Sequence, residues 1–105
     1  MNAQEKANKI KEILDSKKAL NIEVIKVEEK TTLAEYFVIA TGTSTTHIRS
    51  LADEVEDVLE KLNIKPKNLE GKMSDSWKIL DYGSVIVNIF LPEAREYYEL
   101  EKLWK

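Results

Sequence analysis

The sequence predicts a single α/β domain, residues 1–105, in which a mixed β-sheet of about five strands is packed with helices. Apolar residues recur at helical spacing in the segments 3–17, 45–62 and 92–104, and short β-branched or aromatic runs lie between them. The chain has 3 Gly and 2 Pro among 105 residues, which leaves no stretch typical of a linker between domains. The expected order of elements is α-β-β-α-β-β-β-α.

The N-terminal part predicts one helix followed by two strands. In residues 3–17 the apolar side chains are spaced as on one face of a helix, and the solvent face is rich in lysine. The β-branched stretch 22–27 predicts the first strand. The second strand, 36–40, is apolar on both faces, which is typical of a central strand covered on both sides.

The middle of the chain contains the clearest helical pattern. Gly42 ends the preceding strand, and the hydroxyl residues 43–46 offer N-cap side chains. Behind them the apolar residues with helical spacing are Ile48, Leu51, Ala52, Val55, Val58, Leu59 and Leu62. Asn63 and Pro66 end this helix. Its acidic residues are typical of a solvated face, and they would equally attract a basic partner.

The C-terminal part predicts a hairpin between a short strand and a last helix. The short strand is expected near 68–71. Segments 77–82 and 85–91 flank the turn Gly83-Ser84 and predict a β-hairpin. Pro92 fits the first turn of a final amphipathic helix, which carries on one side Ala94, Tyr97, Leu100 and Trp104.

The two-residue turn predicts which hairpin side chains share a face, because opposed residues lie on the same side of a sheet. If Tyr82 pairs with Val85, one face is nearly all apolar and comprises Lys78, Leu80, Tyr82, Val85, Val87, Ile89 and Leu91. The other face is mixed and comprises Trp77, Ile79, Asp81, Ile86, Asn88 and Phe90. We expect the apolar face to lie on the core. The mixed face is typical of a protein-binding patch if it stays uncovered, or of a second packed layer if the last helix covers it.

Composition excludes several kinds of chemistry. The chain has no cysteine and 1 histidine, His47, which removes thiolate nucleophiles, disulfides and multi-histidine metal sites. Its 16 Lys+Arg and 19 Asp+Glu give a formal charge of −3, which argues against holding nucleic acid mainly through phosphates. No apolar run approaches the roughly 20 residues that a bilayer requires. We therefore expect no cofactor, no metal, no membrane and no direct sequence-specific contact with nucleic acid, in a protein of the cytoplasm.

The turn at residues 41–45 is a candidate anion site, because it lies between a predicted strand and a predicted helix. It loosely resembles the Gly-Ser turn of nucleotidyltransferases. Such enzymes need paired carboxylates on an adjoining strand to hold metal ions. Here the acid-x-acid pairs fall on predicted helices, where they do not face each other: Glu54/Glu56 and Glu99/Glu101. An ordinary helix cap is the favoured interpretation, and no catalytic residue is assigned.

Several motifs resemble the Iojap family of ribosomal silencing factors (RsfS), in the family's order along almost the whole chain. They are 36–44 (YFVIATGTS), His47, 51–55 (LADEV), Glu70-Gly71, Trp77, 80–83 (LDYG), 90–98 (FLPEAREYY) and 100–104 (LEKLW). The resemblance implies a mixed α/β domain related in fold to nucleotidyltransferases but without their catalytic acids. It also implies a non-enzymatic factor that binds ribosomal protein L-fourteen, sterically blocks joining of the ribosomal subunits and lowers translation when nutrients are scarce. Free members of the family often form homodimers, so the resemblance also implies a homodimer for this chain when it is free.

The resemblance also implies which residues bind the ribosomal protein: Trp77, Asp81, Tyr82, Asn88 and Phe90. All but Tyr82 lie on the mixed face, so Tyr82 is included on the resemblance alone. The chain departs from the family pattern at Ser84, where an aspartate is usual, and at Asn88, where histidine is common. Two alternatives stay open. One is a nucleotide-binding relative of the nucleotidyltransferases that uses the turn at 43–46, and the other is a homodimeric scaffold whose aromatic patch serves self-association.

Overall fold

A computed structural model describes residues 1–67, 75–99 and 102. Its elements are α1 (Ala3–Ser16), β1 (Leu20–Lys26), β2 (Tyr36–Thr41), α2 (Thr45–Lys61), β3 (Trp77–Asp81), β4 (Val85–Phe90) and α3 (Pro92–Tyr98). The α/β class is confirmed. The described residues form one mixed sheet of 4 strands, in the order β1-β2-β4-β3, where about five strands were expected. The additional strand was predicted near 68–71, which lies outside the described residues.

The sheet combines antiparallel and parallel pairs. β1 pairs antiparallel with β2, β2 pairs parallel with β4, and β4 pairs antiparallel with β3. A parallel pair needs a long crossover, which α2 and the edge strand β3 supply between β2 and β4. β2 is therefore central, as its apolar sequence predicts, and every residue after its first is buried.

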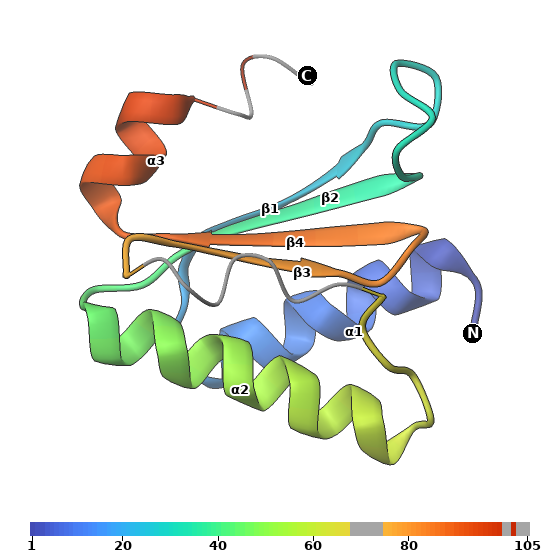
Figure 1. The fold of residues 1–105 in the computed structure, drawn as a ribbon, viewed down its shortest axis with the longest axis horizontal. Coiled ribbons are helices and arrows are strands. Elements are labelled where there is room, and N and C mark those ends of the chain that lie inside the picture. The colour runs from blue at the N-terminus through green and yellow to red at the C-terminus, as the bar shows by residue number, and fades with distance from the viewer. Residues whose placement is uncertain (68–74, 100–101, 103–105) are drawn as a thin grey trace.

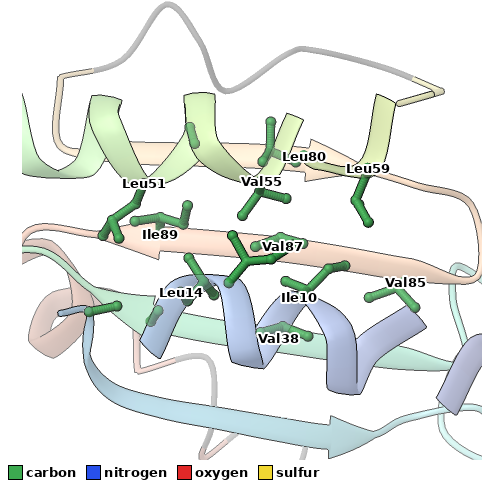
Figure 2. Close-up of a cluster of buried hydrophobic side chains, with 14 of the residues drawn as sticks. Ile10, Leu14, Val38, Leu51, Val55, Leu59, Leu80, Val85, Val87 and Ile89 are labelled. Carbon is green, nitrogen blue, oxygen red and sulfur yellow. The ribbon is translucent and has the colours of Figure 1, made fainter. Parts of the chain in front are cut away.

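The helices α1 and α2 lie side by side on one face of the sheet (Figure 1). The main core fills the space between these helices and the strands, and Figure 2 shows its centre. Its fully buried members include Ile10, Leu14, Val38, Leu51, Val55, Leu59, Leu80, Val85, Val87 and Ile89. Burial of such a side chain stabilises the fold by about 1.5–3 kcal/mol relative to its exposure. The apolar face of the hairpin therefore lies on the core, as predicted.

The opposite face of the sheet carries a smaller buried cluster and α3. The cluster comprises Ile25, Val27, Ala34, Phe37, Ile39 and Phe90. α3 lies over the end of the sheet where β4 ends and β3 begins (Figure 1). It covers part of this face, as the second interpretation expects, and leaves the rest partly exposed. That this exposed part binds a protein stays a prediction.

α3 is shorter than predicted, and a different tyrosine packs against the sheet. The helix ends at Tyr98 because Glu99 adopts a left-handed backbone conformation with φ 48°. Tyr97, predicted on the same side as Ala94, is 81% exposed. Tyr98 follows Ala94 by four positions, and its ring packs against Trp77 instead. The other two residues predicted on that side, Leu100 and Trp104, lie outside the described residues.

The hairpin has the predicted register. The Tyr82 N–H donates to the Val85 carbonyl at 2.9 Å, and Trp77 lies opposite Phe90 on the neighbouring strand. Gly83 has φ +81°, a conformation that glycine adopts without the steric penalty of a side chain. The turn therefore fixes the two faces of the hairpin, and with them the position of every candidate site residue.

Candidate functional site

The hairpin brings most of the candidate residues together. Trp77, Asp81, Asn88 and Phe90 lie on the face turned away from α1 and α2. Tyr82 lies on the other side, in the main core. Trp77 lies directly opposite Phe90 and diagonal to Asn88, which is close enough for these three side chains to touch. Asp81 lies four positions farther along the same strand, nearer the turn.

Trp77 is held in one orientation by three neighbours. Its indole Nε1–H donates to Asn88 Oδ1 at 3.0 Å. Its ring lies 5.0 Å from the ring of Phe90, in a stacked arrangement, and 4.7 Å from the ring of Tyr98. Aromatic pairs at these distances attract each other beyond the area they bury. Trp77 is nevertheless only half-buried, so part of a fixed, large apolar ring faces the solvent.

Asn88 and Phe90 lie beneath this ring. Asn88 is 4% exposed and Phe90 is 0% exposed. The indole N–H can only donate, which assigns the Asn88 carbonyl oxygen to the side that faces Trp77. In the isolated chain both residues therefore support Trp77 from below and offer almost no surface of their own.

The exposed part of this face lies beyond the cover of α3. Ile79, Asp81 and Ile86 are each partly exposed, and they continue from Trp77 along the hairpin towards its turn. Tyr98, at the end of α3, is 48% exposed and adds to the aromatic edge beside Trp77. The result is an aromatic and aliphatic strip with one carboxylate, which we call the docking strip: Trp77, Ile79, Asp81, Ile86 and Tyr98.

Asp81 has a structural role as well as a place on the docking strip. Its Oδ1 accepts a hydrogen bond from the Gly83 N–H at 2.8 Å, which holds the hairpin turn. The carboxylate is still partly exposed at the surface. One side chain can therefore hold the turn and present a negative charge to a partner.

The Tyr82 side chain is 5% exposed and lies in the main core. Its hydroxyl has no hydrogen-bond partner within the described part of the chain. Burial raises the pKa of this hydroxyl well above its usual value, and the negative charge of Glu56 raises it further. In the free protein Tyr82 can therefore act on the docking strip only through the position of the hairpin end.

Ser84, where the resemblance implies an aspartate, faces α1. The Lys6 ammonium donates to Ser84 Oγ at 3.2 Å and lies 3.4 Å from the Tyr82 carbonyl oxygen. This departure from the family pattern therefore alters a contact between the turn and α1, away from the docking strip.

The turn before α2 satisfies its own polar groups. Ser44 Oγ accepts from the His47 backbone N–H at 3.1 Å, and His47 Nδ1 accepts from the Thr43 N–H at 2.9 Å. His47 Nε2 lies 2.9 Å from the Lys17 carbonyl oxygen, which can only accept, so the ring carries its proton on Nε2. These contacts make the turn an ordinary helix cap that also ties α2 to the end of α1, and they give no support to a nucleotide site there.

Neither a metal cluster nor a membrane-spanning helix occurs among residues 1–67, 75–99 and 102. No group of three or more His, Asp or Glu side chains among them is arranged to hold a metal ion. None of the helices in the described ranges is long and apolar enough to cross a membrane.

Sequence reasoning missed Tyr98 and Arg95 as parts of this site. Arg95 joins α3 to the strands through Thr41 Oγ1, at 2.9 Å. The signal for Tyr98 was present: in a helix that begins at Pro92, positions four apart share a face, which pairs Tyr98 with Ala94. No comparable pattern marks Arg95, because its partners lie far away in the sequence.

The chain was compared with known proteins. The sequence profile of the RsfS family, described as "Ribosomal silencing factor during starvation", matches residues 1–105. The chain is 38% identical over 95 residues to "Mitochondrial assembly of ribosomal large subunit protein 1" of Mus musculus, covering 88% of this chain and 42% of the mouse protein. It is 36% identical over 90 residues to "Ribosomal silencing factor RsfS" of Bacillus subtilis, covering 86% of this chain and 76% of that protein.

A solved structure shares the fold. The crystal structure of a protein from Chromobacterium violaceum superimposes with a TM-score of 0.95 at 32% sequence identity, covering 99% of this chain and 87% of the other. Because the family profile spans every residue and the relatives match in both sequence and fold, this chain belongs to the RsfS family of ribosomal silencing factors.

Proposed function

We propose that this protein silences ribosomes by occupancy: it binds ribosomal protein L-fourteen on the large subunit and thereby blocks joining of the small subunit when nutrients are scarce. The observation that carries the proposal is the docking strip, in which a firmly held tryptophan and, four positions along the same strand, a carboxylate share a partly exposed sheet face. Family membership supports a ribosome-associated regulator. The name of the mouse relative, which refers to assembly of the large subunit, supports that subunit as the partner.

The docking strip has the chemistry of a protein interface. Tryptophan is among the residues most enriched at interface hot spots, where truncation typically costs more than about 2 kcal/mol of binding energy. Trp77 is already oriented by Asn88 and Phe90, so little side-chain freedom is lost when a partner packs against it. Asp81 would meet a lysine or arginine of the ribosomal protein.

The overall charge fits the same partner. The net charge of −3 opposes direct contact with RNA phosphates and favours a basic protein at an RNA-rich surface. Binding of this kind needs no catalytic group, and we propose that the protein is not an enzyme. Its working compartment would be that of the ribosome, the cytoplasm.

The candidate residues divide into two roles within this proposal. Trp77 and Asp81 touch the ribosomal protein directly. Asn88 and Phe90 hold the Trp77 ring, and Tyr82 packs the hairpin end against the core, so these three act on the partner through the docking strip.

Sucrose-gradient sedimentation of purified ribosomal subunits tests the proposal. With wild-type protein we expect free subunits to accumulate and the protein to travel with the large subunit. Trp77→Ala should abolish both effects without changing the circular dichroism spectrum. Leu62→Ala is the matched control, because Leu62 is an apolar side chain, 45% exposed, at the end of α2 in the helical layer. An unchanged joined-ribosome peak with wild-type protein would rule the proposal out.

A homodimeric scaffold is the alternative use of the same surface, because an exposed aromatic strip also suits self-association. The molar mass of wild type and of Trp77→Ala, measured by light scattering, distinguishes self-association from ribosome binding as the use of this surface. If the strip serves self-association alone, Trp77→Ala dissociates a dimer and the wild-type protein leaves subunit joining unchanged. If dimerisation masks the ribosome-binding surface, adding large subunits should dissociate the dimer.

A further inference from the structure

We propose that Arg95 is a positioning residue of the docking strip: it holds α3 on the sheet so that the Tyr98 ring packs against the Trp77 ring and keeps it ready for the partner. This inference rests on the proposed function for its effect on binding. The positioning itself is a property of the free protein and is tested separately.

Arg95 joins α3 to two strands that are distant in sequence. Its guanidinium donates to the backbone carbonyl of Asn21 and, at 2.9 Å, to Oγ1 of Thr41, at the end of β2. It also lies 3.9 Å from the Glu23 carboxylate on β1. The Arg95 side chain is only 13% exposed, so these contacts are largely shielded from water.

The acceptors of Arg95 are fixed by the sheet. Thr41 is 3% exposed and is the last residue of the central strand. Asn21 falls in the irregular start of β1, where the pairing register with β2 shifts between Leu20 and Glu23. A backbone carbonyl outside the regular ladder is free to accept from a side chain, and here it accepts from Arg95.

Within the described ranges, 1–67, 75–99 and 102, few other contacts attach α3 to the domain. Throughout its length, which is fully described, none of its residues is buried. Figure 1 shows α3 on the face of the sheet opposite the one that α1 and α2 cover. Apart from the guanidinium, its contacts include Ala94, packed against the smaller cluster, and Tyr98, whose ring lies against those of Trp77 and Phe90. A short helix without a buried face is not stable by itself, so its position depends on such contacts.

The geometry links this anchor to Trp77. Arg95 and Tyr98 lie three positions apart on the same short helix. The Tyr98 ring lies 4.7 Å from the Trp77 ring, tilted against it, and 6.1 Å from the Phe90 ring, in a stacked arrangement. If the anchor is lost, Trp77 keeps its contacts with Asn88 and Phe90 but loses its third neighbour. The partner must then order the helix as well as the ring, which weakens binding.

The first experiment measures the free protein. The chain has 2 tryptophans, so every variant carries Trp104→Phe and the fluorescence then reports Trp77 alone. Arg95→Ala should make Trp77 more accessible to quenching by acrylamide. Arg95→Lys should lie between Ala and wild type, because a lysine keeps the charge near Glu23 but has no planar fork for two acceptors. Lys9→Ala is the control, since it removes a cation from an exposed i,i+3 pair on α1.

The second experiment measures affinity for purified ribosomal protein L-fourteen, at a temperature where circular dichroism shows every variant folded. Arg95→Ala should weaken binding about tenfold, the cost of ordering roughly one further aromatic side chain and its helix. In a Tyr98→Ala background the same substitution should cause no further loss, because Arg95 acts through Tyr98.

The outcomes separate the inference from the proposed function. Greater quenching of Trp77 together with weaker binding that disappears in the Tyr98→Ala background supports the inference. Unchanged quenching overturns it, and so does an equal loss of binding in both backgrounds, which would indicate general destabilisation. If quenching changes but the wild-type protein does not bind L-fourteen, the positioning role stands and the proposed partner is wrong.

Discussion

The two roles of Asp81 can be separated by a pair of substitutions. Its carboxylate accepts the Gly83 N–H at 2.8 Å and also lies partly exposed on the docking strip. Asp81→Asn keeps an oxygen acceptor for the turn and removes the charge, because asparagine supports the same turn geometry. Asp81→Ala removes both. The comparison therefore asks whether the charge or the turn matters for binding.

The geometry sets the expected magnitudes. A hydrogen bond to a charged group contributes about 1.5–3 kcal/mol, and partial exposure of this carboxylate reduces the value. We expect Asp81→Ala to lower the free energy of unfolding by about 1–2 kcal/mol, and Asp81→Asn by less than about 1 kcal/mol. Truncating one partner of a charge pair at an interface costs about 2 kcal/mol or more, so both variants should bind at least about 30-fold more weakly.

Urea unfolding and affinity for the ribosomal protein at low and high salt provide the measurements. The Asn variant should be nearly as stable as wild type, bind weakly, and show a flatter salt dependence, because screening acts on the charge that it lacks. Asp57→Asn, on the exposed acidic face of α2, is the control for loss of one negative charge. If Asp81→Asn binds as tightly as the control at low salt, the carboxylate has no part in docking. An Asp81→Ala variant as stable as wild type would refute the turn argument.

Three further predictions concern stability. Gly42→Ala should lower the free energy of unfolding in urea by about 1–3 kcal/mol, because the added Cβ would lie 2.5 Å from Ile48 Cγ2. An unchanged free energy of unfolding would mean that α2 shifts without cost to make room for the Cβ. His47→Ala should lower the free energy of unfolding by about 2 kcal/mol, which is roughly 1 kcal/mol for each of the two hydrogen bonds of the ring, to Thr43 and to the end of α1. A smaller decrease would show that water takes the place of the ring in these hydrogen bonds. Tyr82→Phe should stabilise the fold, because it removes a buried hydroxyl without a described partner. Since the pKa of Tyr82 is raised in the folded state, wild-type stability should fall as pH rises above about 10, and Tyr82→Phe should show a shallower fall; parallel pH profiles would contradict the assignment.

Local sequence chemistry was sufficient for the hairpin. The glycine turn and the alternation of side chains fixed both the register and the faces, and the structure confirms them from Trp77 opposite Phe90 onwards. The hydrogen bond between Trp77 and Asn88 could also have been predicted. Trp77 lies opposite Phe90, and Asn88 lies two positions before Phe90 on the same face, which makes it a diagonal neighbour of Trp77. The sequence left open whether Asn88 bonds locally or meets a partner, and its 4% exposure in the free chain favours the local bond.

The position of α3 could not be predicted in the same way. Its end depends on the left-handed conformation of Glu99, which no glycine signals. Its anchor depends on Arg95 reaching Asn21 and Thr41, separated from it by 74 and 54 positions. Periodicity describes which side of a helix is apolar, but it carries no information on long-range polar contacts. Consequently, the sequence selected Tyr97 as the packed residue where the structure has Tyr98.

The two layers of the domain also determine which substitutions can test function. The main core lies between the sheet and the helices α1 and α2, on the face away from the docking strip, and most of the largest buried side chains belong to it. Trp77 is half-buried at an edge strand, so its loss removes part of one ring cluster and leaves that core intact. Phe90 is fully buried, and truncating it would cost about 3–5 kcal/mol through the cavity it leaves. A loss of ribosome binding in Trp77→Ala therefore reports on the docking strip, whereas the same loss in Phe90→Ala would report mainly on unfolding.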